Sequence, residues 1–234
     1  MSGGVDALSS QQRRTLDLLG IGVWRDRARV IDPEPQQHAV TPVAATRDSD
    51  WASLQAEVAS CVQCPLHEGR TQTVFGVGNR NASWMIIGEA PGAEEDRQGE
   101  PFVGRAGQLL NEMLRAVGLA RSEVYIANIL KCRPPQNRDP RADETEACSA
   151  YLQRQVELVG PGLVLAVGRI AAQSLLADDS PVGRLRGRVH RYGPADIPLV
   201  VTYHPAYLLR SPAQKRKAWA DLCLARQTLR ESIG

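Results

Sequence analysis

The sequence contains no long hydrophobic run. Its first twenty residues, MSGGVDALSSQQRRTLDLLG, are amphipathic and lack the apolar core of a secretory signal. Nowhere does the sequence reach the roughly 20 consecutive apolar residues that are needed to cross a bilayer. These absences argue against a membrane-spanning protein, and we expect a cytoplasmic protein with no membrane partner.

Glycine motifs for nucleotide binding are also missing. The loop GEAPGAEED at residues 88–96 follows an apolar run, but it matches neither GxxxxGK[ST] nor GxGxxG. A nucleotide cofactor therefore gains no support from this loop. The loop instead predicts a tight turn in which backbone N–H groups and a carboxylate approach a ligand closely.

Five cysteines are present, and four of them form two pairs with the spacings C-x2-C (Cys61, Cys64) and C-x15-C (Cys132, Cys148). In a reducing cytosol, such thiols are more typical of metal ligands or redox groups than of disulfides. Four thiolates suit either tetrahedral zinc or an iron–sulfur cluster, and the spacing alone does not decide between them. Cys223, in LCLARQTL, is expected to pack as a small hydrophobic residue.

Short apolar runs alternate with amphipathic segments after residue 50. Four runs predict strands, at residues 84–88, 124–130, 163–168 and 199–204. Strands separated by helices in this way indicate a parallel sheet that is covered on both faces. We therefore predict an α/β fold for residues 51–234, with three layers (α/β/α) and a central, mainly parallel four-stranded sheet.

The first 50 residues have a different character. Residues 9–20 suit a short helix, whereas residues 29–50 show no sustained period and contain three prolines, which indicates a linker. We predict an N-terminal extension over residues 1–50 that is free to bind a protein partner. The chain is expected to be a monomer.

Polar residues lie at or near the carboxyl ends of three of the predicted strands: Glu89, Asn128 and His204. In an open α/β sheet, ligands bind outside the carboxyl ends of the strands, so these side chains are candidates for one shared site. Taken singly, each has a structural alternative, as a turn cap, a solvent-facing carboxylate or a loop histidine.

Positive charge is unevenly distributed, although the net charge is only +2. Residues 181–217 contain eight Lys or Arg residues and a single acidic residue, Asp196. Such a segment suits a polyanion, and a solvated basic face would have the same composition.

Four sequence elements occur together and in order: the four paired cysteines, GEAPGAEEDRQGEPFVGRAGQLL, YIANILKCRPPQNRDP and HPAYLLR. In this combination the chain closely resembles the family 4 uracil-DNA glycosylases, which are iron–sulfur proteins that excise uracil from DNA. The resemblance covers roughly residues 53–230. It implies that the partner is uracil-containing DNA, single- or double-stranded.

The resemblance implies roles for three residues in recognition of the base. Phe102 would stack on the uracil ring, and Asn128 would read its amide edge. His204 would donate a hydrogen bond to O2 as negative charge builds up there. His204 is therefore an expected catalytic residue.

Other residues would lie on the side from which water attacks. By resemblance these are Glu89, as a catalytic residue, and the backbone at Ala90. Glu95 would either exclude a C5 methyl group or orient polar groups, and both roles remain open. Ala206 departs from the family, which usually has serine there.

The resemblance also implies a cofactor and a DNA-binding surface. A [4Fe–4S] cluster would be held by Cys61, Cys64, Cys132 and Cys148, with zinc as the alternative. DNA would be contacted by Tyr207, Leu208, Leu209, Arg210, Arg184 and Arg186.

Competing functions remain open on the sequence alone. A non-catalytic iron–sulfur DNA-binding module or replication accessory would keep the cysteines and the basic segment, but it would not need Phe102, Asn128 and His204 together. A protein that traps uracil-DNA covalently through an inserted histidine is disfavoured, because no histidine occurs between His67 and His190.

Overall fold

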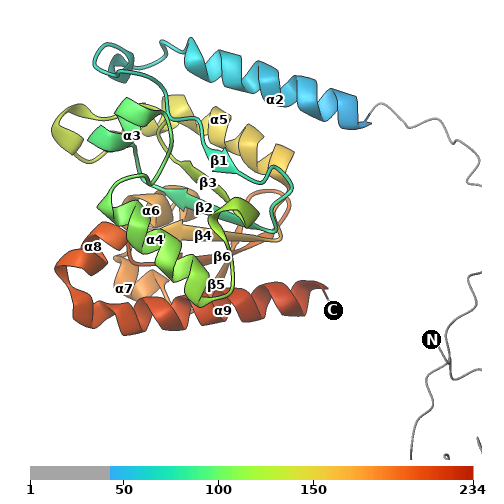
Figure 1. The fold of residues 1–234 in the computed structure, drawn as a ribbon, viewed down its shortest axis with the longest axis vertical. Helices are drawn as coiled ribbons and strands as arrows, with labels where there is room; N and C mark the ends of the chain where they lie inside the picture. The colour runs from blue at the N-terminus through green and yellow to red at the C-terminus, as the bar shows by residue number, and fades with distance from the viewer. Residues whose placement is uncertain (1–42, 234) are drawn as a thin grey trace, which may run out of the picture. The chain divides into compact units, whose positions relative to one another are not determined.

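The computed structural model describes residues 43–233 and shows a sheet between two helical layers (Figure 1). The strand order in the sheet is β1-β3-β2-β4-β6-β5. The central strands are β2 (Trp84–Gly88), β3 (Tyr125–Asn128), β4 (Leu163–Val167) and β6 (Ile197–Thr202). Neighbours among these four pair in parallel, which confirms the predicted α/β fold with a mainly parallel sheet.

The prediction of four strands was wrong, because two antiparallel strands extend the sheet at its edges. Strand β1 (Val77–Gly78) pairs with β3, and β5 (Val189–Tyr192) pairs with β6. Strand β1 has only two residues, and β5 alternates exposed and half-buried positions. Neither carries the continuous apolar run by which the central strands were recognised.

Adjacent residues of each central strand face opposite helical layers, since side chains alternate across a sheet. In β2, Met85 and Ile87 pack in one core cluster, and Trp84 and Ile86 pack in the other. The first layer contains α2 (Val43–Ala59), α5 (Ala142–Val159), α6 (Arg169–Leu176) and α7 (Val182–Leu185). The second contains α4 (Arg105–Ala116), α8 (Pro205–Arg210) and α9 (Lys215–Ile233). Figure 1 shows α2 and α5 above the sheet and α4 and α9 below it, so the predicted three layers are confirmed.

The connections between these elements contain short helices. Helix α3 (Ala93–Gln98) lies in the loop after β2. Single 3-10 turns occur at Pro65–His67, Arg121–Glu123, Pro135–Asn137 and Pro212–Gln214.

The covering helices are amphipathic rather than uniformly apolar. In α4, Leu110, Met113 and Leu114 are buried, and Gln108 and Arg115 on the opposite face are exposed. This spacing of apolar residues buries one stripe of the helix and leaves the other in water. Between residues 43 and 233, no helix combines the length and apolarity needed to span a membrane.

Helix α2 extends into the segment that was predicted as a linker. The chain is helical from Val43, directly after Pro42, because no proline or glycine interrupts the residues that follow. The compact unit that contains the sheet also begins at Val43, rather than at the predicted boundary of residue 51. The predicted helix at 9–20 and the rest of the linker lie outside the described residues.

Candidate active site

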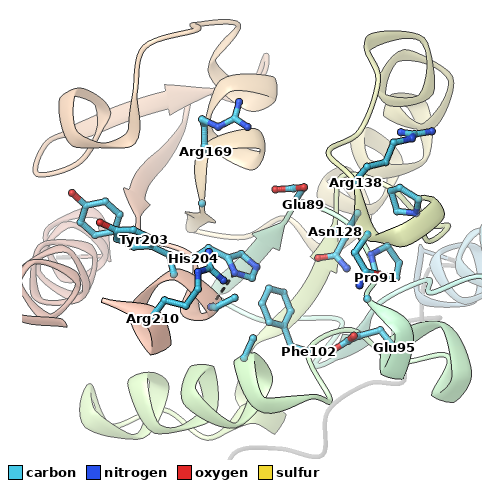
Figure 2. Close-up of a pocket in the computed structure, with 18 of the residues that line it drawn as sticks. Glu89, Pro91, Glu95, Phe102, Asn128, Arg138, Arg169, Tyr203, His204 and Arg210 are labelled. Carbon is cyan, nitrogen blue, oxygen red and sulfur yellow. Dashed lines mark hydrogen bonds between the residues drawn. The ribbon is translucent and has the colours of Figure 1, made fainter. Parts of the chain in front are cut away.

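A cavity of about 680 Å³ opens at the carboxyl ends of the central strands. Its wall includes Glu89 after β2, Asn128 at the end of β3, Gly168 after β4 and His204 after β6. Figure 2 shows the side chains of Glu89, Asn128 and His204 converging on it from separate segments. The structure thus brings together the three polar residues that the sequence places at strand ends, in a cavity of the size that binds small molecules.

Asn128 presents an unused hydrogen-bond acceptor to this cavity. Its side chain is 2% exposed, and its Oδ1 atom has no hydrogen-bond partner among the described residues. Its backbone is fixed by pairing with Gly88 in β2 and by Lys131, whose Nζ donates to the Asn128 carbonyl at 2.8 Å. Because an unpaired buried polar atom costs about 1–3 kcal/mol, the amide is suited to accept a hydrogen bond from a ligand.

Gly88 leaves the space that the Asn128 amide and the Phe102 ring occupy. A Cβ atom at position 88 would lie 2.5 Å from Oδ1 of Asn128 and 2.7 Å from two carbons of the Phe102 ring. Both distances are far below van der Waals contact. Any side chain at this position would therefore displace the two residues that line the inner end of the cavity.

The loop that carries Phe102 is held by Glu95. The Oε1 atom of Glu95 accepts hydrogen bonds from the backbone N–H groups of Val103, at 3.0 Å, and Gly104, at 3.1 Å. Phe102 itself has a φ of 56°, which a non-glycine residue adopts only when its surroundings enforce it. Of the two roles predicted for Glu95, these contacts support the orientation of polar groups.

His204 is held as a neutral hydrogen-bond donor. Its ring stacks on Phe102, with centroids 5.6 Å apart and planes inclined by 30°. Its Nδ1 accepts from the backbone N–H of Ala206 at 3.1 Å, so the ring proton lies on Nε2. Burial, with a smaller contribution from Arg210, lowers the pKa of His204 to about 4. At neutral pH the residue therefore offers an Nε2–H group without a positive charge.

Glu89 has the opposite perturbation. Burial, followed by the negative charge of Asp139, raises the pKa of Glu89 to about 7, against a smaller lowering effect of Arg169. In Figure 2 the Glu89 carboxylate points into the cavity, across from His204. A carboxylate with this pKa exchanges protons near neutral pH, which suits a general base that acts on water.

Several wall residues were missed in the sequence. Among them are Pro91, Arg138, Arg169 and Tyr203. Tyr203 was assigned to the interior of a predicted strand. Arg169 lies two residues after strand β4. The expectation that ligands bind at the carboxyl ends of the strands, which identified Glu89 and His204, therefore applies to Arg169 as well.

Two of the six residues predicted to contact DNA make contacts within the protein instead. Leu208 is 1% exposed, because its face of α8 packs in the core cluster that contains α4. Arg186 forms two hydrogen bonds to Asp221, at 3.0 and 2.7 Å, and the Asp221 side chain is 0% exposed. The burial of Leu208 argues against its contact with DNA. Arg186 is 16% exposed and is held by Asp221, whose buried charge needs a partner, so its contact with DNA stays a prediction.

The other four residues predicted to contact DNA are accessible. Tyr207 and Arg210 line the cavity, Leu209 is 37% exposed, and Arg184 is exposed. They extend from the cavity along α8 and α7. Their contact with DNA stays a prediction.

The four paired cysteines line a second, small cavity of about 10 Å³. All four are free thiols. Three of the sulfur atoms accept hydrogen bonds from N–H groups. The Arg70 side chain donates to Cys132 Sγ at 3.2 Å. The backbone N–H groups of Lys131 and Gln63 donate to the sulfur atoms of Cys148, at 3.3 Å, and Cys61, at 3.5 Å. Within residues 43–233, no three His, Cys, Asp or Glu side chains are grouped to hold a single metal ion.

Two cations border this thiol group and bond to neutral acceptors. Lys131 is 1% exposed, and its Nζ donates to the Asn128 carbonyl and to Oε1 of Gln155 at 2.6 Å. Arg70 donates to the carbonyls of Cys61, at 2.9 Å, and Ala59, at 3.1 Å. Because a buried cation is costly without a counter-charge, deprotonated thiols that hold a metal would complement this environment.

The fold and the cavity define an α/β protein with a site for a flat, polar ring, bounded by an aromatic face, an amide and a neutral imidazole. The uracil DNA glycosylase superfamily model matches residues 75–223. The chain is 44% identical over 172 residues to a type-4 uracil-DNA glycosylase of Archaeoglobus fulgidus, covering 70% of this chain and 86% of the relative. The type-4 enzyme of Pyrobaculum aerophilum is 41% identical over 181 residues (75% and 92%), and that of Thermotoga maritima 43% over 170 residues (71% and 86%). The chain belongs to the uracil DNA glycosylase superfamily.

We predict that one glutamate carboxyl group titrates near neutral pH. In a ¹³C NMR titration of the whole chain, the Glu89 carboxyl signal should move around pH 7, because burial disfavours the charged form. That transition should vanish in Glu89→Gln. If every glutamate carboxyl titrates near the ordinary value of about 4.3, the assigned environment of Glu89 is incorrect.

Proposed function

We propose that the protein hydrolyses the N-glycosidic bond of deoxyuridine in DNA, which releases uracil and leaves an abasic site. The observation that carries this proposal is the buried Asn128 side chain beside Phe102 and His204, whose Oδ1 has no hydrogen-bond partner among the described residues. Support comes from the relatives, which are named type-4 uracil-DNA glycosylases and of which this chain covers 86% or more in the three cases above.

Recognition requires that the nucleotide leave the base stack, because a stacked base does not reach a cavity of this kind. Uracil then lies against the Phe102 ring. Oδ1 of Asn128 accepts from N3–H, and its amide nitrogen donates to O4. Cytosine would present an acceptor and a donor in the reverse order, and each mismatch would cost about 1–3 kcal/mol.

Cleavage develops positive charge on the sugar and negative charge on the departing base. The Nε2–H group of His204 donates to uracil O2, where this negative charge gathers. The lowered pKa of His204 keeps the ring neutral, so it donates a hydrogen bond from Nε2–H and carries no positive charge. A donor placed in this way contributes about 3 kcal/mol, or roughly a hundredfold in rate.

Water attacks the sugar from the side lined by Glu89 and the backbone at Ala90. As a carboxylate, Glu89 accepts a hydrogen bond from the water and stabilises the positive sugar. Because its pKa is raised to about 7, the active form is present above neutral pH and is lost as the pH falls. DNA is held outside the cavity by Tyr207, Leu209, Arg210 and Arg184.

A [4Fe–4S] cluster bound by Cys61, Cys64, Cys132 and Cys148 is the cofactor that we propose. The donor set fits, because four thiols line one cavity and Lys131 and Arg70 offer positive charge beside them. When bound, the cluster would supply a cross-link between the segment after α2, the loop after β3 and helix α5. Zinc is the second candidate, although the described side chains are not grouped around a single ion.

Three further expectations stay predictions. They are the monomeric state, the cytoplasmic location and a protein partner for residues 1–50. The last concerns residues that lie almost wholly outside the described part of the chain.

The catalytic assignment predicts different defects for Asn128 and His204. We would measure single-turnover excision from a uracil-containing oligonucleotide, with alkali cleavage of the abasic product. His204→Ala should slow the chemical step about a hundredfold with little loss of DNA affinity, since its bond strengthens in the transition state. Asn128→Asp should lose uracil excision, because a carboxylate cannot donate to O4.

The exposed Asn81 provides a matched amide, and Asn81→Ala should behave as the wild type. A wild-type protein that leaves uracil in DNA would refute the proposed activity. Asn128→Asp at the wild-type rate would refute the role of the amide alone.

The cofactor assignment predicts that the purified protein is brown, contains about four irons per chain and absorbs broadly at about 400 nm. Cys148→Ser should lower the iron content and the melting temperature, whereas Cys223→Ser, outside the thiol group, should change neither. Colourless protein that contains one zinc per chain would establish the alternative.

A further inference from the structure

Three arginine side chains from three different segments border the cavity: Arg138, Arg169 and Arg210. Figure 2 shows them around its rim, with the base-binding residues between them. Arg138 and Arg169 have different partners. Arg138 donates to both carboxylate oxygens of Glu144, at 2.8 and 2.5 Å, and the Glu144 side chain is 1% exposed. This bidentate pair joins the loop after β3 to helix α5 and does not exchange readily, because Glu144 is buried.

Arg169 has a far more accessible partner. It is the first residue of α6, and its Nη2 donates to Oδ2 of Asp139 at 2.5 Å. The two side chains are 50% and 65% exposed. An ion pair so exposed to water is weakly held, and another anion can replace the carboxylate.

We propose that Arg169 binds a DNA phosphate beside the flipped deoxyuridine, and that Asp139 occupies Arg169 until DNA displaces it. This inference rests on the proposed function. A nucleotide rotated into the cavity keeps its sugar at the mouth, so its flanking phosphates pass along the rim. The guanidinium geometry suits two phosphate oxygens as well as it suits a carboxylate.

The position of Arg169 argues for a phosphate rather than the base. The base is bounded by Phe102, Asn128 and His204, which come from other segments. Arg169 enters the wall from the loop after β4, where its charge and that of Asp139 act on Glu89. The pair therefore lies on the sugar side of the site, where the backbone must pass.

This arrangement gives the two members of one ion pair opposite effects on DNA affinity. Arg169→Ala removes a phosphate ligand and should weaken binding. Asp139→Asn removes a competitor and a repulsive charge, and should tighten it. A purely structural ion pair predicts the same sign for both, and a misfolded variant would not gain affinity.

The test uses the full chain and a single-stranded oligonucleotide with one arabino-2′-fluoro-deoxyuridine, which resists cleavage because the fluorine disfavours positive charge on the sugar. The Kd is measured over a series of salt concentrations. Arg169→Ala should raise the Kd about tenfold and reduce the salt slope by about 0.7. Asp139→Asn should lower the Kd severalfold.

A second exposed pair provides the control. Arg154 on α5 donates to Glu57 on α2 at 2.5 Å, with side chains 39% and 45% exposed. Arg154→Ala and Glu57→Gln make the same charge changes away from the cavity, and should leave the salt slope unchanged. If Arg169→Ala matches Arg154→Ala, or if Asp139→Asn also weakens binding, the inference is overturned while the wild-type activity stands. A wild-type protein that neither binds nor cleaves the substrates would overturn the proposed function and this inference together.

Discussion

The candidate site depends on the parallel register between β2 and β3. This register sets Asn128 directly beside Gly88, the one residue type that leaves room for both the amide and the Phe102 ring. A slip of one residue would turn Asn128 toward the opposite face of the sheet, because side chains alternate along a strand. The apolar residues of β3 prevent such a slip, since Ile126 and Ala127 belong to different core clusters.

Desolvation in this cavity shifts the pKa values of His204 and Glu89 in opposite directions. It lowers the pKa of His204 and raises that of Glu89, so that a neutral donor faces one side of a bound ring and a carboxyl group near its pKa faces the other. For both residues the largest cause of the pKa shift is burial rather than a neighbouring charge. The cost of burying Asn128 without a hydrogen bond is offset when a ligand supplies one.

Much of the fold was predictable, because the central strands are continuous apolar runs and the helices between them have amphipathic stripes. Because these apolar runs mark where each strand ends, the polar residues Glu89, Asn128 and His204 could be recognised at the carboxyl ends of the strands. The errors concern information that is not local. Strands β1 and β5 are defined by their partner strands, and Leu208 is buried by its packing in the core cluster that contains α4. The family resemblance placed Phe102 and Glu95, but the support of the Phe102 loop by Glu95 became visible only in three dimensions.

In the proposed mechanism, the Asn128 amide and the His204 imidazole read the imide edge and O2 of uracil. The most direct measurement is an NMR titration of the ¹⁵N-labelled wild-type chain with free uracil and, separately, with N3-methyluracil. The account predicts that uracil shifts the Asn128 side-chain amide and His204 Nε2–H signals, and that N3-methyluracil shifts neither, because its methyl group removes the donor and collides with Oδ1. Equal shifts with the two ligands, or shifts confined to other residues, would contradict the account.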